Sequence, residues 1–174
     1  MKIYIITGER GSGKTRLLAE FANYALSEGI SAAGIYTNAI ELDGERTGYM
    51  VNDIRSGKRR LLCSTEEETN IKAGRYFFYE EAIEFGKKCL YESEDADLII
   101  VDEAGPLEIN GGGWYPPLKK IFEKDSKKAL FISIRFRLIE NFCDEFGIKP
   151  ELIFNTSDTD LIQEMEQILH GYRR

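Results

Sequence analysis

A glycine-rich stretch near the N-terminus carries the clearest chemical signal in the chain. It follows the apolar run at residues 3–7 and reads Gly8-Glu9-Arg10-Gly11-Ser12-Gly13-Lys14-Thr15, a full match to the pattern G-x-x-x-x-G-K-[ST]. Glycines let the backbone turn sharply, so that successive N–H groups can converge on phosphate oxygens. Lys14 supplies a positive charge for β- and γ-phosphates, and the Thr15 hydroxyl can ligate Mg²⁺. We therefore predict that these eight residues bind nucleotide phosphates and that Lys14 also acts in catalysis.

A second signal is the acidic pair that follows the most strongly apolar run, residues 98–101. Asp102 and Glu103 are expected at the carboxyl end of a buried parallel strand, where sheets of this type bind their ligands. Asp102 would bind Mg²⁺ through its water shell as the partner of Thr15. Glu103 can accept a hydrogen bond from a water molecule and orient it for in-line attack on a γ-phosphate. Glu103 is therefore the candidate catalytic base, and Thr15 and Asp102 are the candidate metal ligands.

The next apolar run, residues 129–134, ends in polar side chains that could reach the same place. In phosphate-loop proteins with an acidic pair of this kind, another strand usually lies between the phosphate-loop strand and the acidic strand, and this run is the natural candidate. Arg135 could then stabilise transition-state charge, and Ser133 could sense the phosphate by a hydrogen bond. The alternative is that Arg135 is a surface residue that opens the next helix, and whether Arg135 or Arg137 acts at the phosphate stays open.

Three other features have weaker interpretations. Residues 111–114, three glycines and Trp114, could form a mobile flap that stacks the tryptophan on a base, but packing of Trp114 in the core is favoured. The basic cluster at residues 55–60 is expected to be a solvated hairpin tip. Arg10 could face either solvent or a phosphate.

The elements that position these residues alternate between short apolar runs and amphipathic segments, which predicts a parallel sheet covered by helices. Strands are predicted at residues 3–7, 31–38, 98–101, 129–134 and 152–154, and helices at 14–26, 79–91, 118–124, 138–146 and 158–169. Residues 49–54 and 59–63 flank a glycine-containing turn and predict an antiparallel hairpin, inserted at about residues 45–64. Since no repeat or linker interrupts the pattern, we predict a single domain, residues 1–174.

Composition narrows the classes of protein further. Lys and Arg number 23 against 30 Asp and Glu, and the net charge of −7 disfavours a nucleic-acid partner. His170 is the single histidine, which argues against a histidine metal site or base. The three cysteines lie far apart and predict neither a disulfide framework nor a zinc site. No apolar run is long enough for a membrane span or a signal-peptide core, so we expect a cytoplasmic protein with no membrane partner.

The motifs and their spacing resemble a known family, the small P-loop nucleoside-triphosphatases, which includes the vertebrate cancer-related nucleoside-triphosphatase and stand-alone enzymes of thermophiles. Besides the glycine-rich loop, the resemblance rests on Arg-Thr-Gly-Tyr at residues 46–49, on Val-Asp-Glu-Ala-Gly-Pro-Leu-Glu at residues 101–108, and on the closing unit at 152–169. It spans nearly the whole chain. Family members often read Asp-Glu-Ile-Gly-Lys-Met-Glu-Leu at the acidic pair. Here Ala104, Pro106 and Leu107 replace the Ile and the Lys-Met, which removes a positive charge near the predicted site.

The resemblance implies a RecA-like P-loop NTPase fold, a three-layer α/β sandwich with a mainly parallel sheet. It also implies Mg²⁺-dependent hydrolysis of nucleoside triphosphates such as ATP and GTP to the diphosphate and phosphate, with little base preference. Lys14 and Thr15 are carried over as phosphate and metal contacts, Asp102 as the metal partner and Glu103 as the water-activating residue. Two alternatives stay open: a small-molecule or nucleotide kinase, and a nucleotide-dependent switch or adaptor. The sequence does not indicate the oligomeric state.

Overall fold

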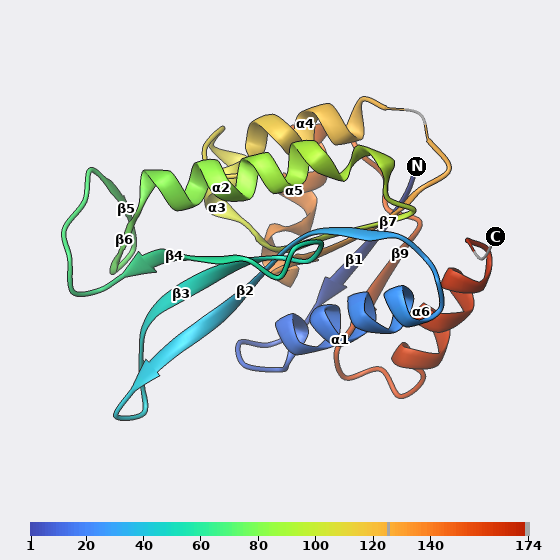
Figure 1. Cartoon of the computed structure of the whole chain (residues 1–174), viewed down its shortest axis with the longest axis horizontal. Coiled ribbons are helices and arrows are strands. Elements are labelled where there is room, and N and C mark those ends of the chain that lie inside the picture. The colour runs from blue at the N-terminus through green and yellow to red at the C-terminus, as the bar shows by residue number, and fades with distance from the viewer. Residues whose placement is uncertain (125, 173–174) are drawn as a thin grey trace.

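The computed structural model describes residues 1–124 and 126–172, whose strands form one mixed sheet with helices on both faces (Figure 1). The strands are β1 (Lys2–Thr7), β2 (Ala32–Leu42), β3 (Glu45–Asp53), β4 (Arg59–Ser64), β5 (Ile71–Ala73), β6 (Tyr76–Phe78), β7 (Leu98–Ala104), β8 (Ala129–Ile134) and β9 (Leu152–Asn155). The helices are α1 (Lys14–Ser27), α2 (Glu80–Tyr91), α3 (Pro106–Ile109), α4 (Tyr115–Phe122), α5 (Ile139–Phe146) and α6 (Leu161–His170), with 3₁₀ turns η1 (Glu92–Asp95) and η2 (Phe136–Leu138). Among the described helices, none combines the length and apolar character needed to cross a bilayer.

The sheet has a parallel half and an antiparallel half that meet at β2. Its order is β5-β6-β4-β3-β2-β7-β8-β1-β9. The pairs from β2 through β7, β8 and β1 to β9 are parallel, whereas those from β2 through β3, β4 and β6 to β5 are antiparallel. The α/β class is confirmed, but the prediction of a mainly parallel sheet is wrong for the described strands.

The reason lies in β2, which continues to Leu42 instead of ending near residue 38. The chain then reverses at Asp43 and Gly44, whose φ angles of 51° and 81° suit a two-residue hairpin turn, and returns directly as β3. Although β3 pairs with β4 in antiparallel fashion, both strands continue the main sheet through β2. The structure therefore does not set residues 45–64 apart as an inserted hairpin.

The strand order confirms that β8 lies between β1 and β7. Because β1, β8, β7 and the first half of β2 are parallel, their carboxyl ends reach the same edge of the sheet, and the N-terminal end of α1 lies at this edge (Figure 1). The segments that carry the candidate site residues thus meet at one edge.

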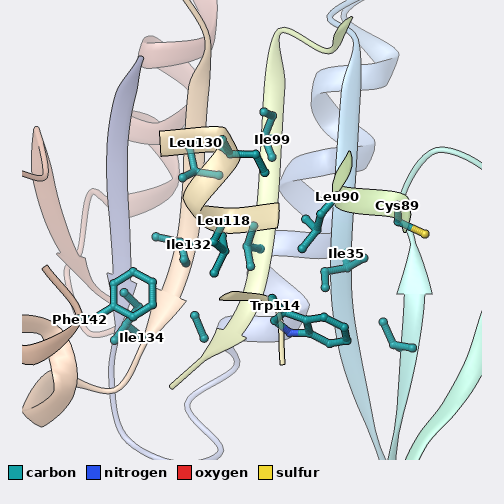
Figure 2. Close-up of a cluster of buried hydrophobic side chains, with 14 of the residues drawn as sticks. Ile35, Cys89, Leu90, Ile99, Trp114, Leu118, Leu130, Ile132, Ile134 and Phe142 are labelled. Atoms are coloured by element: carbon teal, nitrogen blue, oxygen red, sulfur yellow. The ribbon is translucent and has the colours of Figure 1, made fainter. Parts of the chain in front are cut away.

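Two apolar clusters fix the helices to the two faces. Alternate residues of β1 enter opposite clusters, with Ile5 on the side of α2, α4 and α5 and Ile6 on the side of α1 and α6. Trp114 belongs to the first cluster and is 4% exposed, which confirms the prediction of core packing (Figure 2). Burial also raises the pKa of the Cys63 and Cys89 thiols to about 12, as expected of unreactive core cysteines.

Residues 105–117, for which no strand or helix was predicted, contain the one-turn helix α3 and the start of α4. α4 begins at Tyr115, earlier than predicted, because Pro116 and Pro117 occupy its first turn, where helical N–H groups have no intrahelical acceptor. The sequence analysis also missed the short β5–β6 pair, which turns at Gly74.

Candidate nucleotide site

The glycine-rich loop joins the end of β1 to the start of α1. Gly8, Gly11 and Gly13 adopt φ angles of 149°, 81° and 91°, which residues with side chains rarely adopt. A side chain at Gly8 would also collide with the Thr156 hydroxyl. Thr156 follows β9 and supports the loop, because its hydroxyl donates to Ser12 Oγ at 2.8 Å and its N–H donates to the Thr7 carbonyl at 2.9 Å.

Helix α1 begins directly after this loop, with Gly13 at its N-cap. In the described structure no side chain caps it, and its first turn contains no acidic residue. The free N–H groups and the positive end of the helix dipole therefore remain available at the loop, an arrangement that favours a bound anion.

Lys14 lies across the loop and bonds its backbone. Its Nζ donates to the carbonyl oxygens of Gly8 and Glu9, each at 2.8 Å. Burial lowers the pKa of Lys14, while the nearby charges of Glu103 and Asp102 raise it. The ammonium group thus lies close to the acidic pair, as the predicted phosphate contact requires.

Asp102 stands at the end of β7 with its whole side chain buried. Its Oδ2 accepts from the Thr15 hydroxyl at 2.7 Å, from the Thr37 N–H at 3.1 Å and from the Thr37 hydroxyl at 3.2 Å, and its Oδ1 accepts from the Ser133 hydroxyl at 2.5 Å. Thr15 and Asp102, which the sequence analysis paired as metal ligands, are therefore in direct contact.

Glu103 occupies a β-bulge between β7 and β8. Val101 pairs with Ile132 and Ala104 with Ile134, so that two residues of β7 stand opposite Ser133 alone. Glu103 takes a φ of 57°, and its N–H donates to Ser133 Oγ at 2.7 Å. At this bulge Glu103 is exposed, whereas the neighbouring Asp102 is buried.

The charges around Glu103 come from several elements. Desolvation by the surrounding protein raises the pKa of Glu103, and so does the neighbouring Asp102, whereas Arg135, Lys14 and Arg46 lower it. Arg135 is exposed just after β8, and its charge affects the pKa of both Lys14 and Glu103, so it lies near the acidic pair. Ser133 is 1% exposed, and its hydroxyl donates to the Asp102 carboxylate and accepts from the Glu103 N–H, so it holds the Asp102 carboxylate and the Glu103 backbone.

Other residues considered in the sequence lie elsewhere. Trp114 is in the core, and Arg137 is exposed on η2. Arg55 of the basic cluster pairs with Asp95 at 2.5 Å on the surface. Arg10, by contrast, is part of the glycine-rich loop at the site, and its side chain is exposed.

The sequence analysis missed three residues at the site, although each follows a signal. Thr37 lies where the parallel half of β2 ends, and Thr156 directly follows β9, so strand ends could have indicated both. Glu108 is 3% exposed, and its two oxygens accept from the Gly105 N–H at 2.7 Å and the Trp114 N–H at 3.0 Å. Glu108 therefore fixes the segment that follows the acidic pair.

A glycine-rich loop between a strand and a helix, with an acidic pair at the end of a nearby parallel strand, is typical of P-loop nucleotide-binding proteins. The sequence pattern of the family described as NTPase matches residues 3–155. The chain therefore belongs to the NTPase family.

Relatives and solved structures agree with this assignment. The chain is 35% identical over 130 residues to the nucleoside-triphosphatase THEP1 of Methanothermobacter thermautotrophicus, covering 72% of each protein. It is 27% identical over 169 residues to that of Archaeoglobus fulgidus, covering 95% of this chain and 98% of the relative. Its fold matches the crystal structure of THEP1 from Aquifex aeolicus with a TM-score of 0.74, 22% identity and 99% coverage of both chains. The solution structure of a human cancer-related nucleoside triphosphatase gives a TM-score of 0.72 at 20% identity, covering 98% of this chain and 97% of that one.

Proposed function

We propose that this protein hydrolyses nucleoside triphosphates to the diphosphate and inorganic phosphate, without a second acceptor substrate and with little preference among bases. The observation that carries the proposal is the 2.7 Å hydrogen bond from Thr15 at the start of α1 to Asp102 at the end of β7. It joins the phosphate loop to the acidic pair across 87 residues of sequence. Relatives named nucleoside-triphosphatase support the same activity.

We further propose Mg²⁺ as the metal, held by Thr15 and Asp102. Both offer oxygen donors, which Mg²⁺ prefers, and in the described residues no cluster of three or more His, Cys, Asp or Glu side chains offers a metal cage. This scarcity fits a metal that takes its remaining ligands from water and phosphate. When bound, the ion neutralises negative charge on the β- and γ-phosphates.

Different residues of this chain bind the phosphates and activate the attacking water. Gly8 to Thr15 bind the phosphates through backbone N–H groups, and Lys14 releases its carbonyl partners to bind the β- and γ-phosphates. Glu103 orients the attacking water and accepts its proton, because its side chain is exposed at the site whereas the oxygens of Asp102 are occupied by donors.

The proposal also covers the domain organisation, the location and the partners of the protein. We infer one domain over residues 1–174 with a RecA-like three-layer order. We also infer a cytoplasmic protein that acts on free nucleotides, with no nucleic acid or membrane as partner.

One assay tests the reaction type. Purified protein with Mg²⁺ and ATP, GTP, CTP or UTP is expected to release phosphate with no added acceptor, at rates that differ little between bases. Release that appears only when a particular nucleoside or metabolite is added would replace hydrolysis with phosphoryl transfer. Nucleotide binding without release in either condition would indicate a switch or adaptor.

A further inference from the structure

We propose that Arg46 of β3 is a further catalytic residue, which contacts the terminal phosphate and stabilises its charge in the transition state. This inference rests on the proposed hydrolysis of nucleoside triphosphates. Arg46 lies far from the phosphate loop in sequence, but a Cβ atom built on Gly11 would lie 3.8 Å from Arg46 Nη2. Its guanidinium group therefore lies against the middle of the loop.

The local structure of β3 directs Arg46 toward this position. Ile40 of β2 pairs with Gly48 and Glu41 pairs with Arg46, so that Thr47 is the extra residue of a β-bulge. The strand needs glycine at position 48, because a side chain there would collide with the Cys63 carbonyl. The Arg46 carbonyl accepts a hydrogen bond from Arg75 Nη2 at 2.6 Å, which anchors the backbone beside the bulge.

The Arg46 side chain is also held in place before any ligand binds. Its Nε donates to Glu41 Oε1 at 3.1 Å. The side chain is 27% exposed. Since Nε is bonded to Glu41, the group stays oriented while Nη2 is presented to the loop, so that less side-chain entropy is lost when it binds a phosphate.

Arg46 brings a positive charge to the loop that is proposed to bind the phosphates, because its guanidinium group lies beside Gly11. Arg46 approaches from β3, whereas Lys14 comes from α1 and Arg135 from the end of β8. Negative charge on the transferring phosphoryl group must be stabilised in a site that contains Asp102 and Glu103, and an arginine supplied by the same chain can do this. The planar guanidinium fork suits phosphate oxygens better than a lysine ammonium does.

A purely structural role for Arg46 and a catalytic role predict different effects of its replacement. If Arg46 only joined β2 to β3 through Glu41, its replacement would lower stability and leave the chemical step unchanged. A phosphate contact that strengthens in the transition state lowers kcat and weakens the binding of a transition-state analogue.

The experiment compares Arg46→Gln and Arg46→Lys with Arg55→Gln. Arg55 is a matched control, because it also lies beside the antiparallel half of the sheet and pairs with a surface carboxylate, Asp95. Acceptor-free phosphate release by the unmodified protein is measured first, and its absence would refute the proposed function separately. The variants are then compared for kcat, KM, unfolding in urea, and affinity for ADP with and without aluminium fluoride.

We expect Arg46→Gln to lower kcat about 10²-fold and to weaken binding of ADP with aluminium fluoride, while ADP alone binds as before. Arg46→Lys should retain more activity than Arg46→Gln and less than the unmodified protein, and Arg55→Gln should be fully active. A normal kcat in Arg46→Gln, or a change confined to KM, would overturn the proposal. Should Arg46→Gln fail to fold, a fully active Arg46→Lys with normal analogue affinity would overturn it instead.

Discussion

Two adjacent carboxylates at the end of β7 differ in exposure, and this difference supports the roles proposed for them. Asp102 is wholly buried, and its oxygens accept hydrogen bonds from Thr15, Thr37 and Ser133. A buried carboxylate is tolerated only with such donors. Glu103 lies in the bulge with a φ of 57° and is exposed. Asp102 is therefore suited to hold a fixed position, and Glu103 to bind a water molecule.

At the level of single residues, Glu103→Gln should remove hydrolysis and leave nucleotide binding intact. Glutamine keeps the size of the side chain but accepts a proton from water poorly, so we expect kcat to fall about 10³-fold. Phosphate release gives kcat, and titration with a fluorescent nucleoside diphosphate gives the affinity. Glu140→Gln, a change at an exposed residue of α5, should be fully active. Activity near normal in Glu103→Gln would remove this residue from the mechanism.

At the level of elements, the sequence predicted the parallel half of the sheet better than the antiparallel half. Residues 98–101 and 129–134 are continuous apolar runs typical of strands buried on both faces, and the acidic pair indicated that the second run lies beside β1. Residues 39–48 are mixed in polarity, so the apolar pattern did not show that β2 continues. Asp43-Gly44 is the one local signal of the reversal, because Asp-Gly is a preferred pair in two-residue hairpin turns.

The residues of the candidate site also differ in how well the sequence predicts them. Lys14, Thr15, Asp102 and Glu103 were predicted from the sequence, because each belongs to a short local motif whose residue types indicate phosphate or metal binding. The contacts of Thr37 with Asp102 and of Thr156 with Ser12 depend on strand register, which no local pattern specifies. The position of Arg46 depends on a bulge one residue away, and a bulge of this kind has no dependable sequence signature.

The packing of Trp114 against α2 requires glycine at position 86. A Cβ atom at Gly86 would lie 2.5 Å from Trp114 Cζ3 and 2.6 Å from Cη2. Alanine normally stabilises a helix by up to about 1 kcal/mol relative to glycine. Overpacking should outweigh this gain, so we expect Gly86→Ala to lower the free energy of unfolding by about 1–2 kcal/mol. Urea denaturation measures the change, and Lys88→Ala on the exposed face of α2 is the control. Higher stability in Gly86→Ala would show that Trp114 moves aside without cost.

Glu108 should make the stability of the segment after the acidic pair depend on pH. Burial raises its pKa from 4.5 to about 7, against the effect of the Trp114 and Gly105 N–H groups. Since the folded pKa exceeds the unfolded value, this contribution to stability is full below about pH 4.5 and is lost as pH rises to about 7. The loss is on the order of 3 kcal/mol.

The measurement is the unfolding free energy of the unmodified protein and of Glu108→Gln between pH 5 and pH 8. Glutamine does not titrate, so the difference between the two proteins should shift in favour of the variant up to about pH 7 and then stay constant. A difference that is independent of pH would show that Glu108 keeps one protonation state throughout.

At the level of the whole molecule, a net charge of −7 opposes the binding of an anionic nucleotide. We therefore expect the affinity to come from groups at one edge of the sheet: the backbone N–H groups of the loop, the N-terminal end of α1 and Lys14, with Arg135 and Arg46 nearby. Their elements belong to both halves of the sheet, since α1 follows β1 and Arg46 lies on β3. A ligand that bridges these elements should stabilise the whole fold.

Ligand binding should therefore raise the melting temperature, and Lys14→Ala should abolish most of that rise. A non-hydrolysable ATP analogue with Mg²⁺ at about 100 times its dissociation constant adds about 2.7 kcal/mol to the free energy of unfolding. For a chain of this length, that gain corresponds to a rise of about 5–10 °C. Scanning calorimetry measures it for the unmodified protein, for Lys14→Ala and for Lys88→Ala, whose side chain is 73% exposed on α2. At the same analogue concentration Lys88→Ala should show the full rise and Lys14→Ala less than about 2 °C, because the variant lacks the cation that binds the β- and γ-phosphates. An equal rise in both variants would mean that the nucleotide binds elsewhere, and the match at residues 8–15 would then be incidental.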